Sequence, residues 1–572
     1  MSGESTATMP GTGWRGVVVV AGFVLVAAGL AWRAFSLEIF NNAFLLDQGA
    51  MRHLRVVPIP AHRGMITDRN GRPLAVSTPV DSIWVNPQDF TATDQIGELA
   101  NALNIPAAAV RKAVTTHPDR QFVYLNRDMS PADARKVLAL NLEGIHVEHE
   151  YRRYYPAGEV VSHVLGFTNI DDIGQEGLEL AYNDWLHGKP GAERVIRDRL
   201  GHIIQEVASL RDPKPGRNLT TSIDLRIQYL AYRDLKAEVE KQGAKSGSIV
   251  VLDPNTGEVI AMANQPAFNP NNRNDFHAAL YRNRAVTDVF EPGSSFKPFT
   301  IAAALETDRY TPASTVDTTP GWIVVDGYTI SDHRDYGLIT LTTLLEKSSN
   351  VGASKIALSL TPKHMWKTYH ALGFGHYTGS GFPGERTGVL RPYRDWHRAG
   401  QAAVSYGYGV SVTALQLTRA YAAIATGGIL RPISFLRLEN PPPGRRVMPE
   451  NVADNLRMML ETVVTDPGTG TLAEVPNYRV SGKTGTSHKA VDGGYSADDY
   501  TGVFCGMIPA EQPRLVACVI MNDPSKGDYY GGLVAAPVFA EVMSGAMRIL
   551  DVPPDDISGE TTAAVVHLGH TS

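Results

Sequence analysis

Cysteine is almost absent from this chain. Its 572 residues include only Cys505 and Cys518, too few for a disulfide-stapled scaffold or a four-cysteine zinc module. The two cysteines lie at about equal distances from a turn expected around residues 509–513, so they would face each other across a hairpin ladder. Such a pair can form a disulfide or remain as two buried thiols. The sequence leaves both states open and favours the thiols.

The chain also lacks a large excess of charge of either sign. The formal net charge is −6, and no run of lysine and arginine stands out. Nucleic-acid-binding domains carry clustered basic residues, so nucleic acid is excluded as a partner. The histidines and glutamates of residues 146–150 alternate with apolar residues, which is typical of a strand rather than of a metal site. We expect no metal and no cofactor.

The sequence has one long hydrophobic run. Residues 16–32 contain no charged residue and are bracketed by Arg15 and Arg33. A helix of this length spans about 25 Å, the short end of a membrane crossing, whereas the core of a signal peptide usually has about 7–15 residues. We therefore predict a single-pass membrane anchor after a cytoplasmic tail at 1–15. A cleaved signal peptide is the alternative.

The part after the anchor divides near Ile227, where the composition changes. Residues 33–226 are expected to form an extended α+β platform, and the helix of the anchor is expected to continue over 35–54. Asn70-Gly71 predicts a hairpin turn, the apolar spacing predicts helices around 93–103 and 131–140, and nothing in the platform indicates catalysis.

The second domain is predicted over residues 227–550, with a loose tail at 551–572. A hairpin at its start and two strands at its end predict one antiparallel sheet, closed from both ends of the domain and flanked by helices. The expected elements are a helix at 228–241, a hairpin at 248–263, helices after Ser294, at 338–360 and at 414–425, strands at 500–508 and 514–522, and a last helix at 538–550.

A serine and a lysine begin one of these helices. Pro298 lacks an N–H group, so the helix must start within a few residues before it. Ser294 then lies at the helix mouth, and Lys297 lies three residues further on the same face. A lysine beside a serine can activate it as a nucleophile. Taken alone, this spacing is equally typical of an ordinary helix cap.

Two further short motifs follow in order, and each occurs once. Ser348-x-Asn350 interrupts a helical region, and Lys483-Thr484-Gly485-Thr486 precedes the returning strands. A helix break and a turn would explain either motif alone. The ordered triple is characteristic of penicillin-recognising serine acyltransferases.

Each motif has a chemical use in such an enzyme. Lys297 would accept the proton of Ser294, and Ser348 would relay a proton to a departing or entering amine. The side chain of Asn350 can hold a substrate amide. Lys483 and Thr486 would dock a carboxylate, while Gly485 would let a peptide lie against the strand. The backbone N–H groups of Ser294 and Thr486 are the expected oxyanion donors.

The chain resembles the class B penicillin-binding proteins over roughly residues 14–548, and most closely their division-specific members. The resemblance rests on the three motifs and on the segments 63–71, 405–413 and 529–532. It implies an α/β transpeptidase domain on a non-catalytic pedestal. The site residues that it implies are Ser294, Lys297, Ser348, Asn350, Tyr406, Tyr408, Lys483, Thr484, Gly485 and Thr486.

The same resemblance implies a function. The enzyme would take a stem peptide that ends in D-Ala-D-Ala, hold it as an ester on Ser294 and pass it to an amine of a neighbouring stem peptide; β-lactams would acylate the same serine. It implies an inner-membrane protein with a periplasmic catalytic domain at the division site, and a SEDS-type septal glycosyltransferase and other division proteins as partners. The alternatives are an elongation-type transpeptidase, a carboxypeptidase or β-lactamase, and a penicillin-sensing receptor or silent scaffold.

Overall fold

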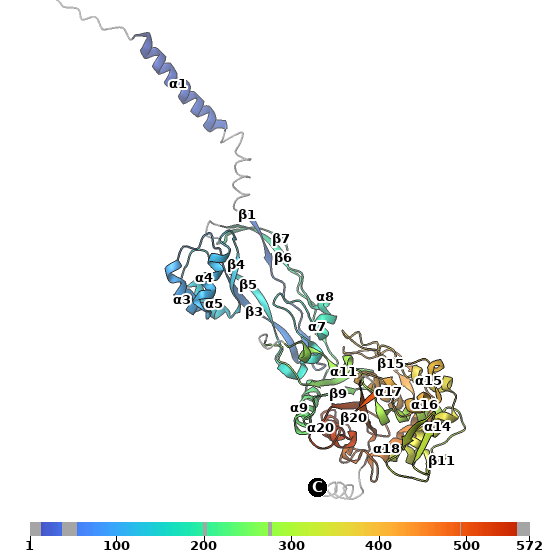
Figure 1. The fold of residues 1–572 in the computed structure, drawn as a ribbon. Helices are drawn as coiled ribbons and strands as arrows, with labels where there is room; N and C mark the ends of the chain where they lie inside the picture. The colour runs from blue at the N-terminus through green and yellow to red at the C-terminus, as the bar shows by residue number, and fades with distance from the viewer. Residues whose placement is uncertain (1–12, 37–53, 198–202, 273–276, 492–493, 557–572) are drawn as a thin grey trace, which may run out of the picture. The chain divides into compact units, whose positions relative to one another are not determined.

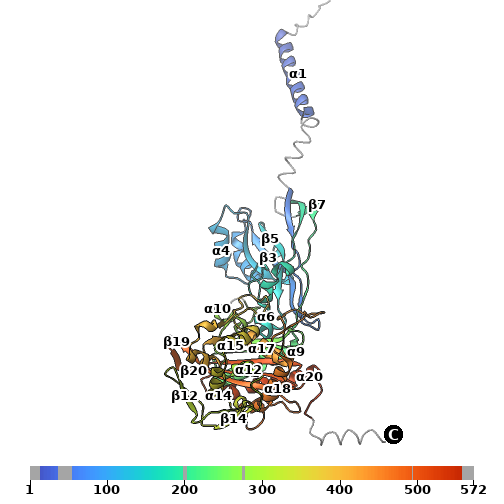
Figure 2. The ribbon, with the colours of Figure 1, turned by 90° about the vertical axis from the view of Figure 1, so that its right-hand side faces the viewer.

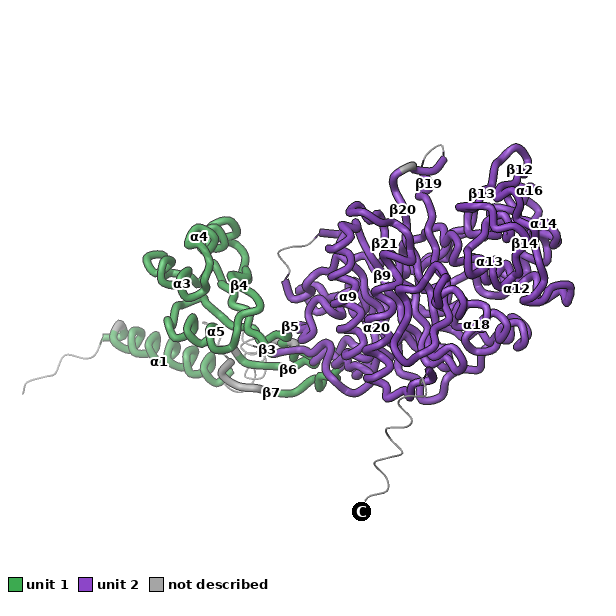
Figure 3. Tube along the Cα trace, turned by 90° about the horizontal axis from the view of Figure 1, so that it is seen from below, with its two compact units in different colours: residues 1–61, 79–151, 189–215 green, residues 62–78, 152–188, 216–572 purple. Residues whose placement is uncertain are grey.

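The computed structural model describes residues 13–36, 54–197, 203–272, 277–491 and 494–556. The chain forms two compact units, coloured separately in Figure 3. Unit 1 comprises residues 1–61, 79–151 and 189–215, and unit 2 comprises residues 62–78, 152–188 and 216–572.

The predicted anchor coincides with helix α1 (Trp14–Phe35), labelled in Figure 1. Its stretch Gly16–Phe35 has a mean hydropathy of 2.1 and none of it is buried, so length and composition suit a membrane crossing. A second stretch, Gly531–Ile549, passes the same test, but 61% of it is buried, which marks it as a core helix of unit 2. The continuation predicted over 35–54 falls almost entirely outside the described residues.

Unit 1 combines strands with a small helical cluster. Helices α3 (Ile96–Leu103) and α5 (Pro131–Leu138) confirm the two predicted helices. Helix α4 (Ala107–Thr116) was not predicted. A core of buried apolar side chains joins these helices to the neighbouring strands. Those strands are β4 (Val123–Met129), β5 (Ile145–Tyr154) and residues 81–85 of β3 (Pro73–Val85), and a separate antiparallel sheet contains β1 (Leu54–Ile59), β6 (Gly191–Arg197) and β7 (Ile203–Arg211).

The residues 146–150 lie within β5, as their alternation predicted. The Asn70-Gly71 hairpin is also confirmed. It joins β2 (Ile66–Thr67) to the start of β3, with Ile66 opposite Ala75. Gly71 has φ +83°, a conformation that glycine adopts without steric cost.

Unit 2 contains the antiparallel sheet that the sequence predicted, and the sheet has five strands, including β19, which was not predicted as a strand of its own. Its order is β10-β9-β21-β20-β19, with every neighbouring pair antiparallel. The first hairpin and the last strands of the domain therefore meet in one sheet. The strands are β9 (Ser246–Leu252), β10 (Val259–Gln265), β19 (Ser481–Val491), β20 (Gly494–Ile508) and β21 (Leu515–Asn522).

Both faces of this sheet are covered by helices (Figure 2). Ile249 and Val251 belong to a core with α9 (Leu225–Gln242) and α20 (Ala536–Ile549). The alternate residues Val250 and Leu252 belong to a second core, with α12 (Lys297–Leu305) and α17 (Ala414–Ala425). Successive strand residues point to opposite faces, so burial on both sides explains the uninterrupted apolar run of β9.

The remaining elements of unit 2 surround this sandwich. They are α6 (Ser162–Leu165), α7 (Gly177–Ala181), α8 (Asn183–Leu186), β8 (Leu219–Thr220), α10 (Ala278–Tyr281), α11 (Arg284–Thr287), η4 (Gly293–Phe296), β11 (Thr315–Asp317), β12 (Trp322–Val325), β13 (Tyr328–Ser331), β14 (Leu338–Thr340), α13 (Leu341–Lys347), α14 (Asn350–Ser359), α15 (Pro362–Ala371), β15 (Val389–Leu390), α16 (Arg398–Val404), β16 (Val410–Ser411), β17 (Ile429–Leu430), β18 (Arg445–Arg446), α18 (Glu450–Val464) and α19 (Gly531–Val534).

The two cysteines correct one expectation. Cys505 on β20 and Cys518 on β21 are direct partners in the ladder, with their Cα atoms 4.1 Å apart, and they form a disulfide. The preference for two free thiols was therefore wrong. The symmetric hairpin that the sequence indicated brings the sulfur atoms together across the ladder.

Candidate active site

The predicted nucleophile lies where two helical segments join. The short 3₁₀ helix η4 holds Ser294, and α12 begins at Lys297. Pro298 falls in the first turn of α12, where its missing N–H costs nothing. Lys297 donates a hydrogen bond from Nζ to Ser294 Oγ at 2.9 Å. The predicted serine–lysine contact is therefore present.

Lys297 is completely buried and has several acceptors around its nitrogen. Its Nζ lies 3.1 Å from Ser348 Oγ and 2.8 Å from Asn350 Oδ1, and it also donates to the backbone oxygen of Ser348. Burial first, and then the positive charge of Lys483, lower the pKa of Lys297 well below its usual value, while Asp332 acts in the opposite direction. The neutral form of the amine, which can accept a proton, is therefore more accessible than in an exposed lysine.

A helix break positions Ser348 and Asn350. Ser348 has φ +59° at the end of α13. Ser349 then caps α14, since its Oγ accepts a hydrogen bond from Gly352 N at 2.8 Å. Asp332 accepts hydrogen bonds from the hydroxyl of Ser349 and the backbone N–H of Asn350. No sequence signal pointed to Asp332, which fixes the beginning of α14 beneath the motif.

Strand β19 brings the third motif to the same place. Lys483 is fully buried, and its Nζ donates to Ser348 Oγ at 3.1 Å and to Thr484 O at 3.2 Å. Burial lowers the pKa of Lys483 to about 7. Ser348 Oγ therefore lies within hydrogen-bond distance of both lysine nitrogens, and its relay of a proton stays a prediction.

Gly485 has a steric role that the sequence did not show, and its predicted role of letting a peptide lie against the strand stays a prediction. A Cβ added to it would lie 2.7 Å from Pro292 O and 3.1 Å from Ser295 Cβ. The absent side chain therefore lets β19 approach residues 290–295, which we call the nucleophile loop. Thr486, the next residue, accepts a hydrogen bond on Oγ1 from Gly531 N at 3.0 Å. The oxyanion roles of the Ser294 and Thr486 amides stay predictions.

The two predicted tyrosines occupy different positions. Tyr408 lines the cavity that contains Ser294, and its hydroxyl accepts a hydrogen bond from His488 N at 3.2 Å. Tyr406 is not among the lining residues, and its ring centroid lies 5.5 Å from that of Tyr408. Burial raises the pKa of both phenols, so both stay neutral at physiological pH.

The cavity around Ser294 has a volume of about 640 Å³, within the range of about 300–1,000 Å³ typical of small-molecule sites. Its aromatic wall includes Tyr500 and Tyr529, whose rings stack with centroids 3.9 Å apart. In the sequence, Tyr529 and Tyr530 entered only through the resemblance to a family, and no pattern predicted that they form an aromatic wall of the cavity. The lining residues that it did not assign are His333, Lys347, Thr469, His488, Tyr500, Tyr529, Tyr530, Gly532 and Leu533.

Clusters of metal-binding groups are not found near this cavity or elsewhere in the part of the chain that the structure describes. There, no three histidine, cysteine, aspartate or glutamate side chains gather in a way that could hold a metal ion.

Known proteins share this organisation. The profile of the penicillin binding protein transpeptidase domain matches residues 247–544, and that of the penicillin-binding protein dimerisation domain matches residues 58–221. The probable peptidoglycan D,D-transpeptidase PbpC of Pseudomonas aeruginosa is 43% identical over 96% of this chain and 98% of its own. The peptidoglycan D,D-transpeptidase FtsI of Escherichia coli K12 is 41% identical over 97% of this chain and 95% of its own.

Solved structures agree with this assignment. The transpeptidase domain of penicillin-binding protein 3 from Burkholderia pseudomallei is 44% identical and matches with a TM-score of 0.55, covering 59% of this chain and 97% of that chain. A peptidoglycan synthetase from Bifidobacterium adolescentis is 27% identical, with a TM-score of 0.70 over 89% of this chain and 98% of that chain. By profile, by full-length identity and by fold, the chain belongs to the class B penicillin-binding proteins.

Proposed function

We propose that this chain is a serine-type peptidoglycan D,D-transpeptidase in which Ser294 carries the acyl group of a D-Ala-D-Ala donor. The observation that carries the proposal is the 2.9 Å contact between Ser294 Oγ and the buried Nζ of Lys297. Burial favours the unprotonated form of an amine, and this form can accept the proton of the attacking hydroxyl.

Acylation uses the two lysines and Ser348 in sequence. Ser294 Oγ attacks the carbonyl carbon of the penultimate D-Ala while its proton moves to Lys297 Nζ. The C–N bond to the terminal D-Ala then breaks, and its nitrogen takes a proton delivered through Ser348 Oγ. The hydrogen bonds of Ser348 Oγ with Lys297 and Lys483 support this route. A β-lactam would acylate the same oxygen by opening its ring.

Release of the ester needs a second nucleophile. An amine from a neighbouring stem peptide attacks the acyl carbon and gives up a proton to Lys297 through Ser348 Oγ. Lys297 passes a proton to Ser294 Oγ as the ester C–O bond breaks and the cross-linking amide forms. Water in place of the amine would make the enzyme a carboxypeptidase or, toward drugs, a β-lactamase. The family membership and the names of both curated relatives favour the amine.

The remaining site residues hold the donor. Lys483, Thr484 and Thr486 supply a positive charge and hydroxyls for its terminal carboxylate. Asn350 and Tyr408 contact the peptide body, with Tyr406 behind Tyr408. The amides of Ser294 and Thr486 receive the oxyanion.

Labelling with a fluorescent penicillin tests these roles. We expect a stable adduct of one drug per chain in the wild type and none in Ser294→Ala. Ser525→Ala, whose hydroxyl bonds to Gly243 O outside the cavity, is the matched control and should label normally. Rapid loss of label without an added amine would favour the hydrolytic alternative.

A cross-linking assay identifies the second nucleophile. With a D-Ala-D-Ala donor and an amine acceptor, the wild type should form the new amide in preference to the free acid. Free acid alone would contradict transpeptidation. Normal division of cells that contain only Ser294→Ala would favour the silent scaffold or the sensing receptor.

The setting of the reaction is a separate part of the proposal. We assign a cytoplasmic tail to 1–15, the anchor to 16–32, the pedestal to 33–226, the transpeptidase domain to 227–550 and a tail to 551–572. The catalytic domain would lie in the periplasm at the division site, beside a SEDS-type glycosyltransferase and other division proteins. A fluorescent fusion should gather at the septum; an even distribution along the side wall would favour the elongation-type alternative.

A further inference from the structure

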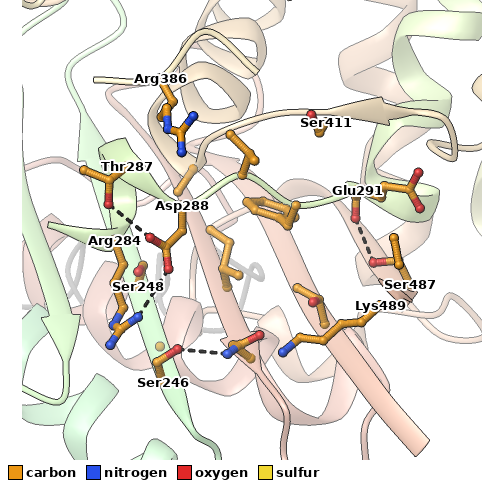
Figure 4. Close-up of a pocket in the computed structure, with 18 of the residues that line it drawn as sticks. Ser246, Ser248, Arg284, Thr287, Asp288, Glu291, Arg386, Ser411, Ser487 and Lys489 are labelled. Atoms are coloured by element: carbon orange, nitrogen blue, oxygen red, sulfur yellow. Dashed lines mark hydrogen bonds and ion pairs between the residues drawn. The ribbon is translucent and has the colours of Figure 1, made fainter. Parts of the chain in front are cut away.

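Unit 2 contains a second cavity, of about 650 Å³, which we call the back cavity (Figure 4). Its volume is close to that of the Ser294 cavity, and among the described residues His488 is the one that lines both. Ligand-binding pockets commonly have about 300–1,000 Å³. Its charged lining residues are Arg282, Arg284, Asp288, Glu291, Arg386 and Lys489.

Strand β19 separates the two cavities. Thr484 and Thr486 line the Ser294 cavity, whereas Ser487 and Lys489 line the back cavity, as the two-residue period of a strand predicts. His488 lines both cavities, and Ala490, which follows a register shift in the strand, lines the back cavity. A ligand in the back cavity would therefore lie against the other face of the strand that carries the substrate-binding motif.

The acidic groups of the back cavity are already engaged. Asp288 pairs with Arg282 (Nε–Oδ1, 3.0 Å) and with Arg284 (Nη1–Oδ2, 3.3 Å). Glu291 accepts hydrogen bonds on Oε1 from Gly409 N at 2.7 Å and from Tyr495 OH at 3.3 Å. Figure 4 shows the carboxyl group of Glu291 directed away from Arg386. Four cationic and two acidic side chains line the space. Lys489 is paired with Asp523, which lies outside the lining, so one positive charge remains in excess.

Arg386 is an exposed residue at the edge of this cavity, and it is the cation of the cavity that the described residues leave without a partner for its side chain. Among them no carboxylate lies within 4.0 Å of its guanidinium, and no side-chain hydrogen bond joins it to the protein. The backbone N–H of Arg386 donates to Val286 O at 3.0 Å, which holds the backbone of this residue at the cavity wall. Figure 4 shows its guanidinium directed toward the other lining residues. A guanidinium offers five donors in a planar fork suited to a carboxylate.

The opposite side of the back cavity is polar. It contains the hydroxyls of Ser246 and Thr501 and the amide of Asn522. Arg284 and Lys489 lie on the same side (Figure 4), but each already has a carboxylate partner, Asp288 for Arg284 and Asp523 for Lys489. Asn522 Nδ2 donates to Ser246 Oγ at 3.1 Å, so the proton of Ser246 remains available to a ligand. Hydroxyl and amide groups across the cavity from an unpaired arginine suit a small molecule that has a carboxylate at one end and amide groups along its body.

We propose that the back cavity binds a carboxylate-bearing peptide, with its carboxylate on Arg386 and its amides toward Ser246 and Asn522. The identification of this ligand as a stem-peptide terminus rests on the proposed function. The ligand would also touch the nucleophile loop, because Phe290 and Glu291 line the cavity three to four residues before Ser294. That loop is fixed by paired hydrogen bonds between Phe290 and Val412 (3.0 and 2.9 Å) and by Ser487 Oγ donating to Glu291 O at 2.7 Å.

The test uses full-length protein whose Ser294 is already acylated with benzylpenicillin, so that the catalytic cavity is occupied. The acylated protein is titrated with N-acetyl-D-alanyl-D-alanine in a calorimeter. We expect saturable binding that Arg386→Gln weakens by about tenfold or more, as loss of a charge-assisted contact does. The same peptide with its terminal carboxylate converted to an amide should not bind.

Arg391→Gln is the matched control, because Arg391 is exposed like Arg386 but is not among the residues that line the back cavity. This variant should bind the peptide like the wild type. Penicillin labelling of each variant verifies that it is folded and separates this test from that of the proposed function. Absence of saturable binding to the acylated wild type, or equal binding by Arg386→Gln, would overturn the proposal. Equally tight binding of inorganic phosphate would also count against it, since it would indicate a general anion site.

Discussion

The side-chain nitrogens of Lys297 and Lys483 each lie 3.1 Å from one atom, the hydroxyl oxygen of Ser348. Both lysines are fully buried. Two ammonium groups cannot both remain charged at low cost in a desolvated site, and their titrations are linked. The arrangement therefore favours a neutral Lys297, which accepts a proton, beside a charged Lys483, which binds a carboxylate.

Removing the charge of Lys483 should move the pH dependence of acylation. That charge lowers the pKa of Lys297, so Lys483→Gln raises it and the acidic limb of the rate profile shifts to higher pH. The measurement is the second-order rate constant for a fluorescent penicillin between about pH 5 and about pH 9. The rate also falls at every pH because the drug carboxylate loses its partner, so the position of the limb is the diagnostic quantity. An unchanged limb would contradict the coupling.

Asp332→Asn should shift the same limb in the opposite direction. The carboxylate of Asp332 raises the pKa of Lys297, and its neutralisation lets that pKa fall further, so the acidic limb moves to lower pH. The rate should also decrease, since Asp332 holds the start of α14 at Asn350. Asp335→Asn, three residues further on and exposed, is the control and should leave the profile in place. A shift to higher pH in Asp332→Asn would contradict this account.

The burial of Lys483 also predicts a cost in stability. Its pKa is about 7 in the folded protein and about 10.4 in an unfolded chain. Between these values the unfolded state binds more protons, so wild-type stability rises with pH across this window. Lys483→Met should therefore raise the melting temperature most at or below about pH 7, with a gain that disappears toward about pH 10. Thermal unfolding at several pH values tests this, and a gain independent of pH would contradict it.

The parts of the site that depend on local chemistry could be predicted from the sequence. Pro298 limits where the helix begins, and this constraint alone places Ser294 and Lys297 on one face of it. The closing of the sheet from both ends of the domain followed from the apolar runs of β9 and β21 and the turns beside them.

Long-range contacts could not be predicted in this way. Asp332 supports a motif that begins sixteen residues later, and the ring of Tyr500 stacks on Tyr529 from another segment. Neither pairing leaves a periodic signal in the chain. Gly485 was recognised, but its close neighbour Pro292 O lies in the nucleophile loop, so the steric reason for a glycine could not be read from the strand alone.

The disulfide should stabilise unit 2 through the unfolded state. Cys505 and Cys518 are separated by 13 positions, and a bridge that closes a loop of this size contributes about 3 kcal/mol on the chain-entropy account. Denaturant unfolding should show a lower midpoint for the wild type with a reductant than without it. The Cys505→Ala/Cys518→Ala double variant should be insensitive to the reductant. A wild-type midpoint that does not respond to complete reduction would contradict the prediction.

Glu179 should matter more for stability than a surface ion pair of the same unit. It accepts hydrogen bonds from Arg63 Nε at 2.8 Å and Arg153 Nε at 2.6 Å, and all three side chains are fully buried. Glu179→Ala leaves two desolvated guanidinium groups without their counter-charge, which typically costs about 3–5 kcal/mol. Glu461→Ala is the control, since Glu461 and its partner Arg479 are 22% and 41% exposed and such pairs contribute at most about 1 kcal/mol.

Urea unfolding of the two variants beside the wild type makes the comparison. Unfolding of Glu179→Ala at the same urea concentration as Glu461→Ala would contradict the prediction. It would mean that water reaches the two arginines once the carboxylate is removed, so that their charges do not remain desolvated. If the predicted difference appears, Arg63→Met combined with Arg153→Met and Glu179→Leu should recover much of the lost stability, because replacing a whole buried ion cluster by apolar side chains removes the desolvation cost together with the attraction.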